Sequence, residues 1–128
     1  MGQIMSLSCK QCGCQKTMSV GIGLMTNNPN IIASCLNGEE EKEWKRLYDS
    51  GQINYFQAEQ KVFYCNNCSD LFCQLSVDAE LKNGEHVTFG NKCEKCHKQL
   101  WEVKLQDNME CPICKMGNIS WKQTGLWD

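Results

Sequence analysis

The sequence lacks the features that would place a protein in a membrane or on nucleic acid. No apolar run reaches the ~18–20 residues that span a bilayer, so we expect no membrane association. The N-terminus has neither the basic nor the apolar region of a secretory signal, which favours a cytoplasmic location. No segment holds more than two adjacent basic residues, and the formal net charge is −2. Nucleic-acid binding is not favoured, because phosphate contacts need a basic surface.

Signatures of common enzymes are also missing from the sequence. We find no nucleophile elbow, no catalytic-triad signature and no pair of acids that stands out. A dithiol oxidoreductase would carry a single Cys-x-x-Cys motif on a βαβ frame, whereas this chain carries several such motifs. We therefore expect the protein not to be an enzyme.

Cysteine, in contrast, is abundant, with 11 residues in a chain of 128. Eight of them form four Cys-x-x-Cys pairs: Cys9 and Cys12, Cys65 and Cys68, Cys93 and Cys96, and Cys111 and Cys114. A tight turn in such a pair aims both sulfurs at one ion, ~2.3 Å away. In a reducing compartment this spacing indicates metal ligands rather than disulfides. The pattern predicts two zinc ions per chain, each held by four thiolates.

The spacing leaves two ways to group the four pairs. In the sequential grouping, Cys9/Cys12 join Cys65/Cys68, and Cys93/Cys96 join Cys111/Cys114. In the nested grouping, Cys65/Cys68 join Cys93/Cys96, and Cys9/Cys12 join Cys111/Cys114. We favour the sequential grouping because it closes shorter loops in the C-terminal half.

Patterning predicts a small, metal-bound, β-rich (α+β) fold with two zinc ribbons and a short helical insertion. In the C-terminal half, alternation over residues 100–105 predicts a strand, residues 106–108 a turn and residues 119–123 a further strand. Residues 93–114 therefore look like two cysteine turns flanking a hairpin. We place an N-terminal ribbon in residues 1–82 and a C-terminal ribbon in residues 83–128.

The insertion, at about residues 26–50, has the pattern of a strand end followed by two helices. Residues 17–25 are largely apolar and predict a strand. Asn28 and Pro29 resemble a helix cap and first turn, and Asn37 and Gly38 would end that helix. Residues 39–49 predict a second helix with an apolar stripe centred on Trp44. We expect this stripe to pack on the ribbons, the alternative being a partner-binding surface.

At its cysteine pairs the chain resembles the zinc-ribbon proteins, which carry two Cys-x-x-Cys turns on facing β-hairpins. The resemblance covers residues 93–123 and, in the first half, the cysteine turns with their flanking strands. The whole chain is also similar to small bacterial two-ribbon proteins, in the order of its turns and insertion and in its ending at residues 125–128. Cys111-Pro-Ile-Cys114 resembles the second cysteine turn of the rubredoxins, which implies iron as an alternative metal.

These observations lead to three functional hypotheses. The first is a protein-interaction module in which closed four-cysteine zinc sites supply folding energy. The second is a nucleic-acid-binding zinc ribbon, which the resemblance favours and the charge does not, since two tetrathiolate zinc sites would bring the net charge to about −6. The third is an iron tetrathiolate electron carrier. Cys14, Cys35 and Cys73 lie outside the pairs, and we expect them to be free thiols, the alternative for Cys14 being a ligand in place of a paired cysteine, since it lies two residues from Cys12.

Overall fold

The computed structural model describes residues 2–106 and 108–127. In these residues the strands are β1 (Gly2–Cys9), β2 (Gln15–Val20), β3 (Ile53–Cys65), β4 (Asp70–Leu81), β5 (His86–Phe89), β6 (Trp101–Glu102) and β7 (Ile119–Trp127). A 3-10 helix, η1 (Leu24–Asn27), precedes the α-helices α1 (Pro29–Cys35) and α2 (Gly38–Asp49). The β-rich fold class with a helical insertion is thereby confirmed.

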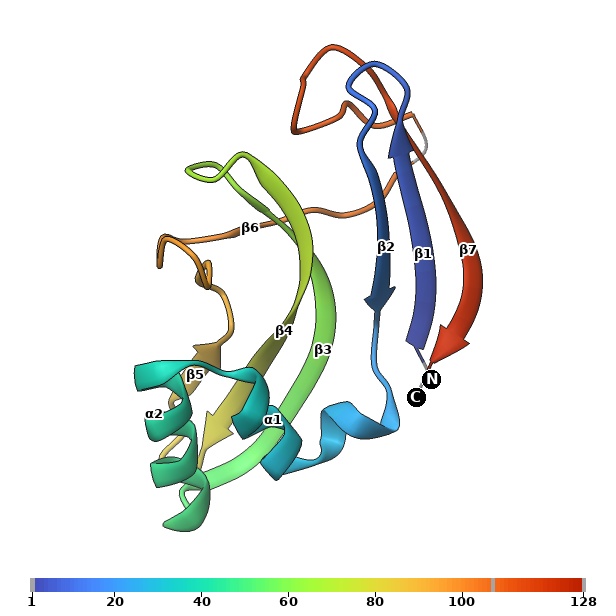
Figure 1. Cartoon of the computed structure of the whole chain (residues 1–128). Coiled ribbons are helices and arrows are strands. Elements are labelled where there is room, and N and C mark those ends of the chain that lie inside the picture. Colours follow the sequence, from blue (N-terminus) through green and yellow to red (C-terminus); the bar gives the residue numbers. More distant parts are fainter. Residues whose placement is uncertain (1, 107, 128) are drawn as a thin grey trace.

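One antiparallel sheet joins the two ends of the chain (Figure 1). Its order is β2-β1-β7, with β1 paired to β2 on one side and to β7 on the other. The register places Cys9, the last residue of β1, opposite Ile119, the first residue of β7. The turn that follows β1 therefore lies beside the loop that precedes β7.

The second sheet is built on a long hairpin of β3 and β4 and has the order β5-β4-β3-β6. The Cys65–Cys68 segment forms the turn of this hairpin, because Cys65 pairs with Asp70. On the far edge of β4, β5 pairs only from Val77 to Glu80, and β6 pairs with β3 at Phe63 and Tyr64. The two short strands bring the cysteine turn at 93–96 alongside the hairpin.

The hairpin expected between residues 93 and 114 is wrong. The strand predicted at 100–105 is only two residues long and pairs with β3 instead of a neighbouring strand. The physical reason is that its apolar residues serve two cores: Leu100 packs beside Cys65 and Cys93, whereas Val103 and Leu105 pack in the core between the sheets. The turn expected at 106–108 and the ending at 125–128 each include a residue, Asp107 or Asp128, outside the described residues.

Each sheet takes strands from both sides of the expected boundary between residues 82 and 83. Strand β7 joins β1 and β2, while β5 and β6 join β3 and β4. The expectation of one ribbon in each segment is therefore corrected, since both sheets are made by segments far apart in sequence. The domain boundary itself, placed between residues 82 and 83, stays a prediction.

The helical insertion has the predicted form. The Asn28 side chain accepts hydrogen bonds from the N–H groups of Asn30 and Ile31, at 2.9 and 3.3 Å, and Pro29 opens α1. Helix α2 buries Trp44, which is 1% exposed, and places its ring against Phe56 and Phe89. Trp44 at the centre of the stripe thus packs inside the protein, as expected, and its side chain is not accessible to a partner. The strand predicted at 17–25 ends at Val20, and η1 takes up its last residues.

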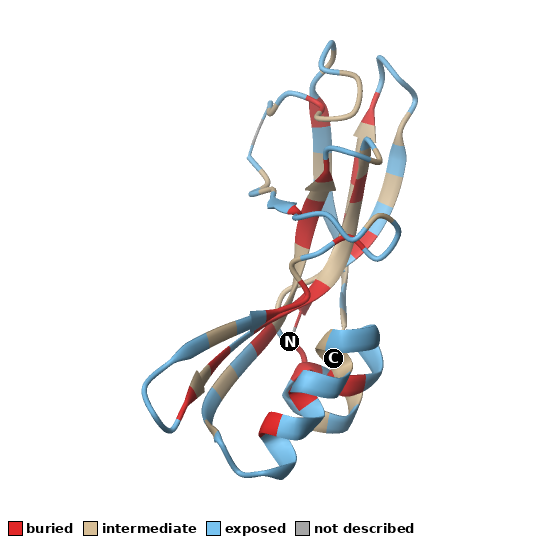
Figure 2. Cartoon of the chain, turned by 90° about the vertical axis from the view of Figure 1, so that its left-hand side faces the viewer, coloured by how far each residue is buried: buried red, intermediate tan, exposed pale blue. Residues whose placement is uncertain are grey.

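Buried residues gather into three clusters along the molecule (Figure 2). The first lies between the helices and the lower half of the β3–β4 hairpin and includes Ile32, Trp44 and Val77. The second fills the space between the two sheets and includes Leu7, Leu71 and Cys111. The third surrounds Cys65 and Cys93. The second and third clusters are small, and each is completed by cysteines from the Cys-x-x-Cys pairs.

Gly90 is a position where the fold tolerates no side chain. Its φ of +82° lies in the left-handed region, and a Cβ there would overlap the carbonyl of Leu75. We expect Gly90→Ala to destabilise the protein by more than ~2 kcal/mol, because the backbone strain and the overlap add together. Gly84→Ala is the matched control, since Gly84 has a φ of +91° but open space around it. The midpoint temperature of thermal unfolding should be much lower for Gly90→Ala than for Gly84→Ala. Equal midpoints would contradict the close packing of Gly90 against Leu75.

Candidate metal centres

The first four-cysteine group joins the two ends of the chain. Cys9 and Cys12 lie on the turn after β1, and Cys111 and Cys114 lie on the loop before β7. The Sγ atoms of Cys9 and Cys114 are 3.7 Å apart, and those of Cys12 and Cys111 are 3.9 Å apart. Cys9 and Cys111 are buried, whereas Cys12 is exposed at the rim.

The second group lies at the end of the β3–β4 hairpin. Cys65 and Cys68 form the hairpin turn, and Cys93 and Cys96 follow β5. The Sγ atoms of Cys65 and Cys96 are 3.5 Å apart, and those of Cys68 and Cys93 are 3.9 Å apart. As in the first group, the first cysteine of each pair is buried and the second is more accessible.

The sulfur spacing in both groups suits a tetrahedral metal ion. Four thiolates ~2.3 Å from a central ion lie about 3.8 Å from one another, which is the edge of the tetrahedron. The sulfurs of each group all lie within 4.8 Å of one another, and all eleven cysteines are free thiols. Each group therefore has the donor type, the number of ligands and the size of a site that could hold one metal ion.

The grouping is the nested one, and the sequential grouping that we favoured from loop length is wrong. Joining Cys9/Cys12 to Cys111/Cys114 closes a loop of almost the whole chain, which costs more chain entropy than the sequential alternative. Two features offset that cost. Pairing of β1 with β7 already brings the two chain ends together, and the cost of loop closure grows only slowly with loop length.

The backbone after each Cys-x-x-Cys pair turns in the same way. The residue that follows the second cysteine has a positive φ in all four turns: Gly13, Ser69, His97 and Lys115, at 74°, 52°, 62° and 59°. In three of the turns its N–H donates to the carbonyl of the first cysteine, at 2.8–2.9 Å. Gly13 suits this conformation because glycine has no Cβ. Ser69, His97 and Lys115 adopt it although a positive φ is uncommon for residues other than glycine, so the signal that they share is their position directly after the second cysteine.

Backbone N–H groups also aim at the sulfurs and favour the thiolate form. The N–H of Lys98 is the main cause that lowers the pKa of Cys96 to about 6, and the N–H of Met116 lowers the pKa of Cys114 to about 7. For Cys111, burial outweighs its backbone hydrogen bonds and raises the pKa. Each group thus contains one cysteine that ionises near neutral pH and can begin metal binding as a thiolate.

A small ion-pair network links the turns of the second group to the other sheet. Asp70, two residues after Cys68, contacts Lys16 of β2 at 3.0 Å and Lys95 of the 93–96 turn at 3.7 Å. Burial by itself raises the pKa of Asp70, but hydrogen bonds from Lys16 and from the Leu71 N–H hold that pKa below its ordinary value. The carboxylate therefore stays ionised and ties the hairpin turn to the neighbouring sheet.

The three remaining cysteines differ in accessibility. Cys14 is half-buried and lies outside both groups, and Cys35 is exposed on α1. The Cys73 thiol is half-buried and donates to the Ser19 carbonyl at 2.9 Å. Burial raises the pKa of Cys73 to about 11, so its thiol stays protonated well above neutral pH. His97, the histidine beside a pair, is not among the grouped ligands of either centre.

We expect iodoacetamide at pH 8 to label Cys35 and to leave Cys73 unmodified in the folded protein. The thiolate is the reactive form, and a thiol whose pKa is about 11 is almost entirely protonated at that pH. Labelling of Cys73 should increase only as the pH rises toward 11. Peptide mass mapping after brief treatment measures both sites, and equal labelling of Cys35 and Cys73 would contradict the burial of the second thiol.

Comparisons with protein-family models, with curated proteins and with solved structures found no significant match to this chain. The resemblance to zinc ribbons therefore rests on the two four-cysteine groups themselves. Neither α-helix in the described part of the chain is long and apolar enough to cross a bilayer.

Proposed function

We propose that each four-cysteine group holds one zinc ion with a structural role, and that the chain is a protein-interaction module. The observation that carries the metal assignment is that four sulfurs gather in each group. Between the two turns of a group, Sγ atoms approach one another to 3.5–3.9 Å. Cys9, Cys12, Cys111 and Cys114 would hold one ion, and Cys65, Cys68, Cys93 and Cys96 the other.

A structural role follows from the ligand number. Four protein thiolates complete the tetrahedral shell of zinc, so no position stays open for a water molecule or a substrate. A bound ion would supply folding energy by fixing two distant turns against each other. We therefore propose no catalytic role for the chain. It would act by binding a partner through a surface whose structure the two ions stabilise.

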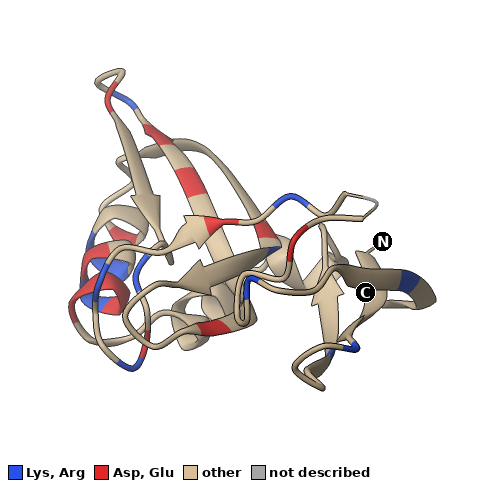
Figure 3. Cartoon of the chain, turned by 90° about the horizontal axis from the view of Figure 1, so that it is seen from above, with Lys and Arg blue, Asp and Glu red and all other residues tan. Residues whose placement is uncertain are grey.

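The distribution of charge supports a protein partner over nucleic acid. Basic and acidic residues are mixed on α2, where Lys45 pairs with Glu41 and Arg46 pairs with Glu43 (Figure 3). Lys61 likewise lies between Glu59 and Glu102. Basic side chains that already contact carboxylates are poorly placed to bind phosphates, and tetrathiolate sites would add negative charge.

We expect the purified protein to contain two zinc ions per chain and to lose its fold when a strong chelator removes them. The two smaller cores are completed by cysteines, so their packing depends on the turns that the ions would fix. Elemental analysis with native mass spectrometry counts the ions, and near-ultraviolet circular dichroism follows the fold. A chelated, metal-free chain with an unchanged spectrum and melting temperature would contradict a structural role.

Iron is the alternative metal that the same experiment distinguishes. A ferric tetrathiolate absorbs strongly in the visible range, whereas the zinc form is colourless. Iron at either centre would favour the electron-carrier hypothesis, and salt-sensitive binding to DNA or RNA would favour the nucleic-acid hypothesis.

A further inference from the structure

Strand β4 has a free edge over the half that follows the Cys65–Cys68 turn. Strand β5 covers β4 only from Val77 to Glu80. After Gly90 the chain leaves the strand ladder, and the Gly90 and Lys92 carbonyls accept hydrogen bonds from the Gln74 side chain instead. Among the described residues, no strand pairs with residues 70–75 on this side of β4. An uncovered edge of this kind presents backbone groups that can pair with another chain.

The hydrogen bonds of β3 show which residues of β4 face this edge. Gln60 exchanges both of its backbone hydrogen bonds with Gly21, at 2.9 Å each, and the Val62 carbonyl accepts from the Val103 N–H at 2.8 Å. Gln60 and Val62 therefore use their backbone groups on the side of β3 away from β4. Their opposite residues are Leu75 and Cys73. In an antiparallel pair, such residues point their own N–H and C=O groups outward, here toward the free edge.

Leu71 follows the same alternation and supports this assignment independently. Its N–H donates to the Asp70 carboxylate at 2.9 Å, so it is not used in the ladder with β3. On the other side of Cys73, the carbonyl of Leu75 lies against the Cα of Gly90. The groups left for a new strand are the Leu71 carbonyl, the Cys73 N–H and carbonyl, and the Leu75 N–H.

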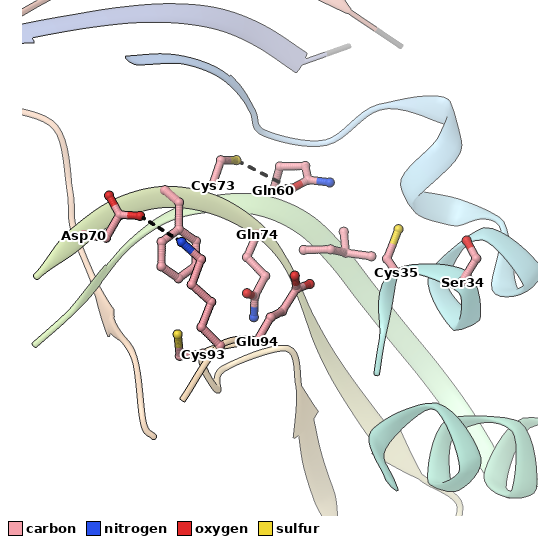
Figure 4. Close-up of a pocket in the computed structure, with 11 residues that line it drawn as sticks. Ser34, Cys35, Gln60, Asp70, Cys73, Gln74, Cys93 and Glu94 are labelled. Carbon is pink, nitrogen blue, oxygen red and sulfur yellow. Dashed lines mark hydrogen bonds and ion pairs between the residues drawn. The ribbon is translucent and has the colours of Figure 1, made fainter. Parts of the chain in front are cut away.

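A cavity of about 470 Å³ runs along these groups. Figure 4 shows Cys35 and Ser34 of α1 at one end, Asp70 at the other, and Cys93 and Glu94 of the cysteine turn on the side. Phe72 and Leu75 contribute apolar lining. This volume is in the usual range for ligand sites, and its position beside backbone donors and acceptors suits an extended chain at ~3.3 Å per residue.

We propose that this edge of β4 binds an extended segment of a partner protein as an added strand. The inference rests on the proposed interaction module and names its surface. The incoming segment would continue the line of β5 and exchange hydrogen bonds with the backbone of Cys73. One side of its binding slot is formed by the cysteine turn at 93–95, so a metal ion at the second centre would hold that wall in place.

The shape and charge of the slot define the occupant. Helix α1 closes one end of the slot and the cysteine turn lines its side, which suits a single extended segment, whereas an edge strand of a second copy, such as β7, carries its own sheet behind it. Glu94 lines the slot and has no ion-pair partner among the described residues. We therefore expect an extended peptide with an apolar residue over Phe72 and a Lys or Arg next to it.

The test uses a phage-displayed library of twelve-residue peptides, selected on the immobilised, zinc-loaded full chain. Amide hydrogen exchange by NMR should first show fast exchange at Cys73 and Leu75, beside slow exchange at Phe72 and Gln74, which pair with β3. A selected peptide should protect the Cys73 and Leu75 amides. Cys73→Pro removes the outward N–H together with the thiol and should weaken peptide binding about tenfold or more, while Cys73→Ala, which removes the thiol and keeps that N–H, should bind like the wild type.

A second pair of variants keeps the test valid if Cys73→Pro does not fold. Cys35→Phe fills the slot from the exposed face of α1 and should abolish peptide binding, and Cys35→Ala is its control. The proposal would be overturned if no peptide can be selected, or if the peptide binds Cys73→Pro as tightly as the wild type. It would also be overturned if, without peptide, protection of the Cys73 amide grows with protein concentration. A peptide that protects other amides would overturn this binding site but would still support the proposed interaction module. The metal count tests the zinc sites of that module separately.

Discussion

The double variant Cys9→Ser/Cys65→Ser is expected to lose both metal ions, whereas Cys9→Ser/Cys111→Ser loses one. In the nested grouping Cys9 and Cys111 belong to one centre and Cys65 belongs to the other. Removing one thiolate from a four-cysteine site leaves an incomplete shell and weakens zinc binding by orders of magnitude. Native mass spectrometry of the purified variants counts the remaining ions directly.

The sequential grouping predicts the opposite result for the two variants, because Cys9 and Cys65 would then share a centre. The control is Cys35→Ser/Cys73→Ser, which lies outside both groups and should retain two ions. Loss of a single ion from Cys9→Ser/Cys65→Ser, together with loss of both from Cys9→Ser/Cys111→Ser, would show that the cysteines are grouped differently from the structure described here.

Trp44→Ala is expected to destabilise the protein by ~3–5 kcal/mol, the range for removing a large aromatic side chain from a core. Trp44 contacts two aromatic rings, with centroids 5.3 and 5.7 Å away, and its indole N–H donates to the Pro29 carbonyl at 3.1 Å. Such a loss is a large part of the stability of a small protein and should lower the melting temperature by roughly 10–20 °C. Thermal unfolding of the zinc-loaded variant measures it.

Tyr48→Ala is the matched control for this prediction. Tyr48 stacks on Trp44 with the ring centroids 5.8 Å apart, but it is 43% exposed and leaves a smaller void. Its replacement should cost ~1 kcal/mol or less. Both variants should still bind two metal ions, because the helical core is separate from the clusters that contain the cysteines. A similar melting temperature for the two variants would contradict the central position of Trp44.

Features that depend on local chemistry could be predicted from sequence. The Asn28 cap and Pro29 fix the start of α1 through interactions within one turn, so the helix appears where the pattern indicates. The eight candidate ligands were likewise identified from a two-residue spacing, because that spacing allows both sulfurs of a pair to reach one ion. The burial of Trp44 followed from the apolar stripe of α2.

Features that depend on long-range pairing could not be predicted in this way. Alternation over 100–105 indicated an exposed and a buried face, but it did not specify β3 as the partner strand or two different cores as the neighbours. The free edge of β4 has no sequence signature at all, since it exists only because β5 is short and its ladder with β4 ends at Phe89.

The sequence by itself therefore determined which cysteines act together in pairs, where the helices lie and which side chain fills the helical core. Only the tertiary structure decided which pairs meet. Cys9 and Cys111 are brought together by the pairing of β1 with β7, a contact between the two ends of the chain. A Cys-x-x-Cys turn carries half of a site and no information about its other half, so the grouping depends on which strands pair, and that depends on packing across the whole molecule.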